Sequence, residues 1–355
     1  MTAVLSCPGC AEPVGSGDGF CEACGRSLKP APACARCGVG TVDDDGYCTA
    51  CGARQPGPGD HAEVDLADVA GVTDRGLRHH RNEDAMAVVR TDGGVVAVVC
   101  DGVSVSPRPQ DASRLACDTA VAVLATGFDP PAGSADRTDA ALPADIPLPR
   151  AGDSAPLGAD APLAGDGSGA DATAEAATRE AALRAAAAVA ALGTPESAPA
   201  CTYVSALVRG GTFTVGWIGD SRAYWLPADG APELLTVDDS WAVEMVAHGL
   251  MTAEQANADR RAHAITRWLG ADAGPVGARV VTRSPTGPGT LLLCSDGLWN
   301  YLPTAEALAA RYADLTGPAV DRARALVGHA LAAGGHDNIT VVLLPVPTPP
   351  EEDPS

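Results

Sequence analysis

Short apolar runs bounded by glycine, aspartate or asparagine recur from residue 64 to residue 346. Runs of this length with turn residues at their ends are typical of buried strands. They are VDLADVAGV (64–72), DAMAVVR (84–90), VVAVVCDG (95–102), CTYVSALVRGGTFTVGWIGDSRAYWL (201–226), GARVV (277–281), GTLLLCSDG (289–297) and NITVVLLPV (338–346). The stretch 201–226 contains a Gly-Gly turn and predicts a meander of antiparallel strands.

Other stretches have the apolar spacing of helices. Residues 111–125 open on an aspartate cap, and residues 172–193 are rich in alanine and end at a glycine. Residues 239–257 predict a further helix, and residues 304–333 predict two more. Because the strands are grouped in hairpins with helices appended, the pattern favours an α+β layered fold over a parallel βαβ sheet.

Eight of the 12 cysteines lie in the first 51 residues, in CxxC pairs, and the second half of this segment repeats the spacing of the first. Four thiolates around one ion form a closed tetrahedral zinc site, and modules this small need the metal in order to fold. The spacing favours structural zinc in a reducing compartment over disulfides or redox thiols. The predicted ligands of two structural Zn²⁺ ions are Cys7, Cys10, Cys21 and Cys24, and Cys34, Cys37, Cys48 and Cys51.

Changes in composition divide the chain into segments. Residues 1–53 form the predicted double zinc ribbon, residues 54–63 a Pro/Gly linker and residues 64–346 the main domain. Within that domain, residues from about 128 to 171 are rich in Ala, Pro, Gly and Asp, a composition that cannot bury a core, and predict a disordered insertion. Residues 347–355 are an acidic, Pro-rich tail.

The net charge of −21, from 24 basic and 45 acidic side chains, limits the partners of the protein. It argues against nucleic acid and against an anionic membrane surface, since both attract concentrated Lys and Arg. No apolar run approaches the ~20 residues that span a bilayer, and no secretory signal is visible. This charge fits a soluble protein, or one that binds cations, and the CxxC pairs lead us to expect a cytoplasmic location.

Acidic residues stand at the ends of several predicted strands, and two of them end a buried run and are followed by glycine. One such Asp-Gly is usually a turn. Several carboxylates that meet at one edge of a sheet sandwich, however, would repel one another unless a cation neutralised them. Ligation by oxygen alone selects Mg²⁺ or Mn²⁺. The set is Glu83, Asp84, Asp101, Asp220, Asp296 and Asp337.

The order and local text of these motifs resemble the PPM family of metal-dependent Ser/Thr protein phosphatases, the type 2C enzymes, in their bacterial form. The segments that carry the resemblance are TDRGLRHHRNEDAMAVV, VVCDG, GWIGDSRAYWL, LLTVDDSWAVEMVAHGLMTAEQA, ITRWLG, LLLCSDGLW and GHDNITVVLL. The resemblance covers residues 64–345 and implies an α-β-β-α sandwich, with metals in a cleft at one edge of two antiparallel sheets. The N-terminal cysteines resemble the double zinc ribbon that is fused to many regulatory proteins.

The resemblance implies two Mn²⁺ or Mg²⁺ ions, with Asp101 as the bridging ligand and Gly102 offering its carbonyl to the second ion. Asp296 and Asp337 are the implied remaining ligands of the first ion. Two such ions generate a hydroxide nucleophile and hold a phosphoryl group for in-line attack.

Glu83 and Asp84 match the pair that holds the second ion or its waters, and the sequence leaves open which of them does so directly. Asp220 resembles the residue that recruits a third, weaker ion in bacterial members. Residues from 238 to about 260 match the flap region of the family, which tunes substrate access.

Two departures from the family pattern concern catalysis. His79 stands where the phosphate-binding arginine usually lies, and Arg78 and Arg81 flank it, so we expect one of these guanidinium groups to bind the phosphate. The loop after the bridging Asp-Gly lacks the glycine-rich text of the family, and its nearest polar residues are Ser104 and Ser106.

The predicted function is hydrolysis of phosphoserine and phosphothreonine in proteins, opposing bacterial Ser/Thr kinases. The expected partners are phosphorylated proteins, among them such kinases and their substrates. The alternative is a binding module, a catalytically weak pseudophosphatase that docks a partner kinase or regulator.

Overall fold

The computed structural model describes residues 5–7, 9–15, 18–25, 28, 34, 37–43, 46–53, 55, 57, 59–126, 169–274 and 277–348. The chain divides into two compact units, residues 1–58 and residues 59–355. The predicted insertion lies outside the described residues except for 169–171, which already belong to a helix, and the predicted tail is described only at residues 347 and 348.

The first unit repeats one local fold. β1 (Leu5–Ser6) pairs antiparallel with β2 (Pro13–Val14) and leads into the first cysteine pair. After each CxxC turn, a backbone N–H returns to the carbonyl of the first cysteine, and its residue has a φ between 63° and 72°. These bonds run from Ala11 to Cys7, from Gly25 to Cys21, from Gly38 to Cys34 and from Gly52 to Cys48. Four equivalent turns confirm that the spacing repeat is also a structural repeat.

The second unit is built on two sheets whose described strand pairs are all antiparallel. The six-stranded sheet contains, in spatial order, β10 (Glu233–Leu234), β9 (Arg222–Pro227), β12 (Gly289–Cys294), β13 (Ile339–Val346), β4 (Val69–Asp74) and β3 (His61–Leu66). The five-stranded sheet contains β11 (Arg279–Arg283), β8 (Thr212–Ile218), β7 (Tyr203–Arg209), β6 (Gly94–Cys100) and β5 (Ala85–Thr91).

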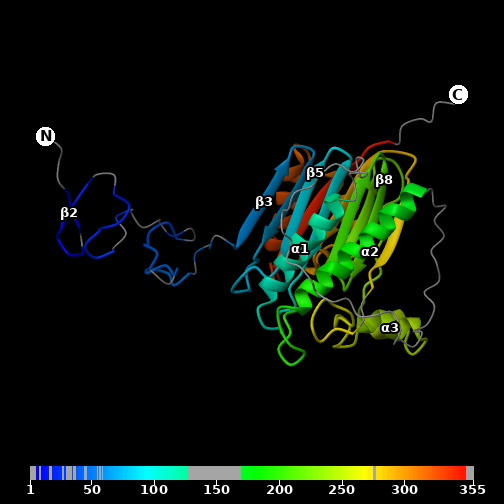
Figure 1. Cartoon of the computed structure of the whole chain (residues 1–355), viewed down its shortest axis with the longest axis horizontal. Coiled ribbons are helices and arrows are strands. Elements are labelled where there is room, and N and C mark those ends of the chain that lie inside the picture. Colours follow the sequence, from blue (N-terminus) through cyan, green and yellow to red (C-terminus); the bar gives the residue numbers. More distant parts are fainter. Residues whose placement is uncertain are drawn as a thin grey trace, which may run out of the picture. The chain divides into compact units, whose positions relative to one another are not determined.

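Helices cover the outer faces of the two sheets. Those on the five-stranded sheet are α1 (Pro109–Thr126) and α2 (Gly169–Ala190), which lie side by side in Figure 1. Those on the six-stranded sheet are α5 (Asp296–Trp299), α6 (Ala305–Ala313) and α7 (Ala319–Ala332). Two short helices, α3 (Trp241–Ala247) and α4 (Ala253–Asn257), form a separate small cluster. None of the described helices is both long and apolar enough to cross a bilayer.

Three buried clusters account for this layering. One fills the space between the sheets with side chains such as Val99, Phe213 and Leu293. A second joins the five-stranded sheet to α1 and α2, and a third joins the six-stranded sheet to α5, α6 and α7. Strands buried on both faces read as continuous apolar runs, which explains the runs in the sequence. The α-β-β-α sandwich is therefore confirmed.

The structure corrects several boundaries and one connection. β3 begins at His61, inside the predicted linker 54–63. The helix predicted at 239–257 is two helices, α3 and α4. The predicted meander is wrong at its last step, because β8 and β9 belong to different sheets. A sequence pattern cannot distinguish a hairpin from a crossing between sheets, since both need apolar strands joined by a tight turn.

Candidate active site

The predicted carboxylates lie where strands of both sheets end at one edge of the sandwich. Asp101 directly follows β6 and Asp84 directly precedes β5, and these strands pair through Cys100 and Ala85. Asp296 follows β12 and Asp337 precedes β13, and these two strands also pair with each other. Residues far apart in the chain therefore meet because antiparallel register aligns the strand ends.

Asp84 is a buried carboxylate with one oxygen held and the other open. Its Oδ2 accepts hydrogen bonds of 2.7 Å from the hydroxyls of Ser295 and Thr340. Its Oδ1 is buried and has no hydrogen-bond donor among the described residues. Burial raises the pKa of Asp84 to about 6, although the two hydroxyls lower it. The open oxygen therefore lacks a neutralising partner.

Asp101 and Asp296 are also carboxylates whose pKa is raised. Burial, followed by the charges of neighbouring carboxylates, raises the pKa of both well above the usual range of aspartate. The charges of Asp84 and Asp296 both act on Asp101, so the three carboxylates are neighbours at this edge. Oδ1 of Asp296 is also buried without a donor among the described residues. Carboxylates in such a group can be ionised together only when a cation lies between them.

Glu83 and Gly102 complete the edge beside Asp101. The hydroxyl of Ser104 donates a hydrogen bond of 2.7 Å to Oε2 of Glu83. Gly102 packs so closely on the Glu83 carbonyl and on Pro109 that a Cβ would collide with backbone atoms, so glycine is required here. Among the described residues, this donor set of carboxylate and carbonyl oxygens fits hard ions such as Mn²⁺ and Mg²⁺.

Asp220 lies in the turn that carries the chain from β8 in one sheet to β9 in the other. Its carbonyl accepts a hydrogen bond of 2.9 Å from Nε1 of Trp299. Burial, followed by the charge of Asp238, raises the pKa of Asp220 to about 7. Asp238 itself is paired with Arg222, at 2.7 Å.

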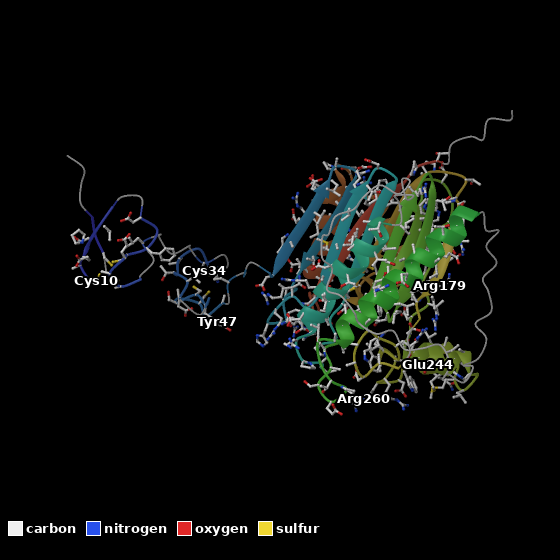
Figure 2. The ribbon with its side chains drawn as sticks, viewed as in Figure 1. Cys10, Cys34, Tyr47, Arg179, Glu244 and Arg260 are labelled. Carbon is white, nitrogen blue, oxygen red and sulfur yellow. The ribbon has the colours of Figure 1, made fainter. Side chains whose placement is uncertain are left out.

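The predicted flap, residues 238 to about 260, begins with anchoring carboxylates and continues into α3 and α4. Oδ2 of Asp239 accepts a hydrogen bond of 2.9 Å from the Gly219 N–H, and its Oδ1 lies 2.8 Å from Arg279. Glu244 on α3 and Arg260, after α4, are labelled in Figure 2. The start of the flap is therefore tied to the turn that carries Asp220.

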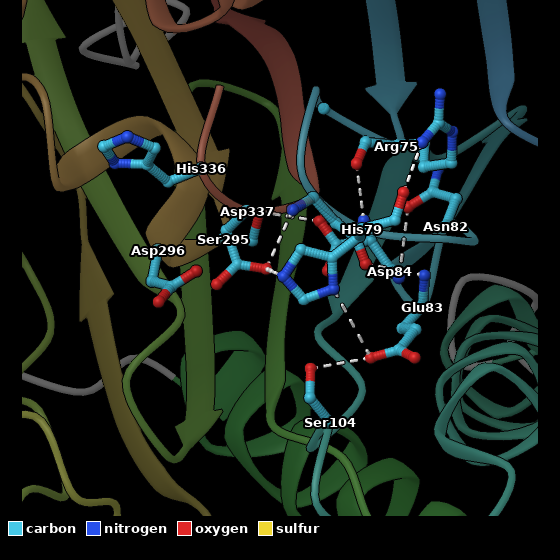
Figure 3. A network of polar contacts seen from close by, with 12 residues as sticks. Arg75, His79, Asn82, Glu83, Asp84, Ser104, Ser295, Asp296, His336 and Asp337 are labelled. Atoms are coloured by element: carbon cyan, nitrogen blue, oxygen red, sulfur yellow. Dashed lines mark hydrogen bonds and ion pairs between the residues drawn. The ribbon is translucent and has the colours of Figure 1, made fainter. Parts of the chain in front are cut away.

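Of the three neighbouring basic residues, His79 faces the predicted ligands, and the prediction that Arg78 or Arg81 binds phosphate stays a prediction. Arg78 is exposed and its guanidinium lies 3.4 Å from His336, and Arg81 is exposed and lies 3.4 Å from Gln110. His79, between them in the chain, instead points into the site, with Nε2 at 3.0 Å from Oδ1 of Asp337. The two arginines are therefore exposed, in what we call the rim of the site. His79 lies between the predicted ligands Asp337 and Glu83 (Figure 3).

Sequence reasoning missed the groups that hold these carboxylates. Ser295 directly precedes Asp296, Asn338 directly follows Asp337, and Thr340 lies two residues further along β13. Small polar residues beside a motif carboxylate were the available signal, but their partners lie more than two hundred positions away in the chain.

Each group of four cysteines in the first unit is closed around one point. The four sulfur atoms of Cys7, Cys10, Cys21 and Cys24 lie within 4.8 Å of one another, as do those of Cys34, Cys37, Cys48 and Cys51. Figure 2 labels one member of each group, Cys10 and Cys34. The grouping is that of a four-thiolate zinc site, and no fifth side chain is needed to complete it. The other four cysteines, Cys100, Cys117, Cys201 and Cys294, are buried in the second unit.

The family model described as Protein phosphatase 2C matches residues 76–332. Serine/threonine phosphatase stp of Listeria innocua is 34% identical over 143 residues, which cover 40% of this chain and 55% of that protein. Serine/threonine protein phosphatase PstP of Mycobacterium tuberculosis is 34% identical over 147 residues, which cover 41% of this chain and 27% of that protein. The chain thus matches about half, or less, of the length of these curated relatives.

Solved structures share the fold. The PPM Ser-Thr phosphatase MsPP from Mycobacterium smegmatis, in complex with cacodylate, matches with a TM-score of 0.52 and 29% identity, over 79% of this chain and 99% of that chain. The catalytic domain of PstP in complex with 2 manganese ions matches with a TM-score of 0.53 and 23% identity, over 81% of this chain and 98% of that chain. With the family match over most of the second unit, these likenesses confirm the predicted resemblance: the chain belongs to the protein phosphatase 2C family.

Proposed function

We propose that this protein is a metal-dependent phosphatase that hydrolyses phosphoserine and phosphothreonine in other proteins. One observation carries the proposal. Asp84, Asp101 and Asp296 are neighbours at the sandwich edge of a protein phosphatase 2C chain, and Asp84 and Asp296 each have a buried oxygen without a donor among the described residues. Such a site is built to hold divalent cations.

The residues that would hold two Mn²⁺ or Mg²⁺ ions are Glu83, Asp84, Asp101, Gly102, Asp296 and Asp337, with Asp220 available to a third, weaker ion. When bound, such ions lower the pKa of a shared water and neutralise charge on the phosphoryl oxygens. Ser295, Thr340 and Ser104 fix the carboxylate orientations through the hydrogen bonds already described. Pre-oriented ligands keep the site geometry constant while the phosphate binds.

The rim supplies positive charge to a site that is otherwise acidic. Arg78 and Arg81 flank the loop over the carboxylates, and each has one long contact, at 3.4 Å, with a neighbouring side chain. Either guanidinium can leave such a contact to bind a phosphate through two parallel hydrogen bonds. In this proposal, the arginines orient the substrate and do not contact the metal ligands.

Phosphorylated proteins are the proposed partners, including Ser/Thr kinases and their substrates. The two curated relatives, which are named Serine/threonine phosphatase stp and Serine/threonine protein phosphatase PstP, support this substrate class. The two four-cysteine groups are proposed to hold two structural zinc ions. A cytoplasmic location is proposed as well, since free thiolates persist in a reducing compartment.

Release of phosphate from a phosphothreonine peptide by the purified full chain, titrated with Mn²⁺, tests the function. Asp296→Asn should lower turnover by more than the roughly 10- to 100-fold that loss of an outer-shell partner costs. Asp272→Asn, which removes an exposed carboxylate bound to Trp268, is the matched control and should keep full activity. Wild-type protein that binds Mn²⁺ but turns over no phosphopeptide would instead indicate the alternative, a binding module.

A further inference from the structure

The loop that carries His79 is held by hydrogen bonds at several points. The side chain of Asn338 donates hydrogen bonds to the carbonyls of Arg75 and Arg81, at 2.8 and 3.0 Å, and accepts one from the Glu83 N–H at 2.7 Å. The Arg75 guanidinium donates to the His79 carbonyl. One asparagine thus fixes both ends of the loop that carries the histidine, immediately beside Asp337.

Among the described residues, two groups contact the same oxygen of the Asp337 carboxylate. Its Oδ1 accepts from the Asn338 N–H at 2.8 Å and lies 3.0 Å from Nε2 of His79. The other ring nitrogen of His79, Nδ1, lies 4.0 Å from Oε2 of Glu83. Figure 3 shows the imidazole between these two carboxylates. Donors that occupy one oxygen of a carboxylate direct its second oxygen elsewhere, which is how outer-shell partners orient metal ligands.

The same arrangement recurs at the other ligands. Asp84 is held at Oδ2 and open at Oδ1, and Asp296 has Asn300 at 3.3 Å from Oδ2 and an open Oδ1. We propose that His79 is a positioning residue, which holds Oδ1 of Asp337 so that Oδ2 faces the metal, in the place where an arginine was expected to bind phosphate. The proposal rests on the proposed function only in that both need a divalent-metal site.

Binding of Mn²⁺ to the full chain, followed by the EPR signal of free Mn²⁺, tests this role without any turnover. His79→Ala should weaken Mn²⁺ binding by about 10- to 100-fold, the usual cost of losing an outer-shell partner. His79→Gln, whose amide can donate to Asp337, should restore most of the affinity. His80→Ala, which removes the exposed neighbouring histidine, is the matched control and should bind as wild type does. Melting in EDTA checks that each variant folds.

Unchanged Mn²⁺ affinity in His79→Ala would overturn the proposal, as would a His79→Gln variant that is folded but no tighter than His79→Ala. These failures differ from a failure of the proposed function. If the wild-type protein hydrolyses phosphopeptide and His79→Ala binds Mn²⁺ normally, only the positioning role of His79 is overturned. If the wild-type protein shows no turnover but His79→Ala still weakens Mn²⁺ binding, only the proposed phosphatase activity is overturned.

A second, independent observation separates the two four-cysteine groups. Leu28 and Gln55 hold equivalent places, since each lies four residues after the last cysteine of its group and each backbone N–H donates to the carbonyl of a glycine, Gly19 or Gly46. The side-chain amide of Gln55 also donates a hydrogen bond of 3.3 Å to Sγ of Cys34. A leucine side chain has no donor for its group.

We infer that the two groups release zinc at different rates, the first faster than the second. A hydrogen bond to a thiolate stabilises its charge and opposes protonation, the step that frees it from the ion. Zinc taken up by the chelator 4-(2-pyridylazo)resorcinol should appear in two phases, one for each group. Cys24→Ser, which removes one ligand of the first group, should leave only the slower phase.

Gln55→Leu gives the second group the side chain of the first and should speed its zinc release by about tenfold. Leu28→Gln is the reciprocal exchange and should slow release from the first group. A slow phase that keeps its rate in Gln55→Leu would overturn the inference, and so would a single common rate in the wild-type protein. Both residues lie in the first unit. Two zinc ions per chain in each purified variant would show that both four-cysteine groups still form.

Discussion

The hydroxyl of Ser295 donates a hydrogen bond of 2.7 Å to Oδ2 of Asp84, across a separation of 211 positions in the chain. Ser295 follows β12 of the six-stranded sheet, and Asp84 precedes β5 of the five-stranded sheet. The bond therefore joins the two sheets at the edge where the carboxylates meet. The Ser295 hydroxyl also accepts a hydrogen bond of 3.0 Å from the backbone N–H of Thr340, on the neighbouring strand β13.

Replacing Thr340 by valine should destabilise the protein and weaken Mn²⁺ binding. The change keeps the shape of the side chain but removes one donor to the buried Asp84 carboxylate, a loss of about 1–3 kcal/mol. Urea unfolding in EDTA measures the first effect and Mn²⁺ titration the second. Thr214→Val is the matched control, since this buried threonine bonds another threonine, Thr282, at 3.0 Å. The control should lose stability but keep its Mn²⁺ affinity.

Asp101→Asn should stabilise the metal-free protein while removing its response to Mn²⁺. Burial and neighbouring carboxylates raise the pKa of Asp101, so its ionised form costs stability at any pH above the unfolded value of about 3.9. The gain should be about 0.5–2 kcal/mol at pH 7 and should vanish below about pH 4, where the folded and unfolded acids are both protonated. Thermal melting with and without Mn²⁺ measures both effects. A variant that is less stable than wild type at pH 7 in EDTA would contradict the expected repulsion.

Loss of the phosphate-binding arginine should raise KM more than it lowers kcat. Removing a guanidinium that binds phosphate costs a charge-assisted hydrogen bond, which corresponds to roughly 10- to 100-fold in KM. Arg78→Ala and Arg81→Ala, measured separately on a phosphothreonine peptide, identify which one binds. Arg184→Ala on α2, where the arginine pairs with Glu180, is the matched control. Unchanged KM in both rim variants would exclude the proposed role of the arginines.

His61→Gln should reduce stability at low pH and not at high pH. Burial lowers the pKa of His61, but hydrogen bonds to Glu63 and Asp74 outweigh burial and raise it. A raised histidine pKa adds stability that is fully present below the unfolded value of about 6.5 and is lost as the pH rises through the folded value. The difference in urea midpoint between wild type and variant should therefore shrink from pH 5.5 to pH 9. A difference that grows over this range would show that the ion pairs do not form.

Local pattern was enough for much of the fold and for the ligand types. A continuous apolar run in the sequence indicates a buried strand. This pattern identified β6, β12 and β13 and the acidic residues at their ends. The sequence also predicted the two four-cysteine groups, because local spacing specifies a zinc site made of two CxxC turns. The specific combination of motifs then indicated the family.

Long-range geometry decided the rest. No local signal distinguishes a hairpin from the crossing of β8 to β9 between sheets, and the structure places Asp220 in that crossing. The sequence indicated Arg78 or Arg81 for the phosphate, because charge and residue type are local properties. It did not indicate that His79 faces Asp337, because the loop that carries His79 is held by Asn338, far along the chain. The sequence by itself determined which groups can bind metal. Only tertiary packing, by aligning distant strand ends, decided which oxygens of those groups are held and which are open.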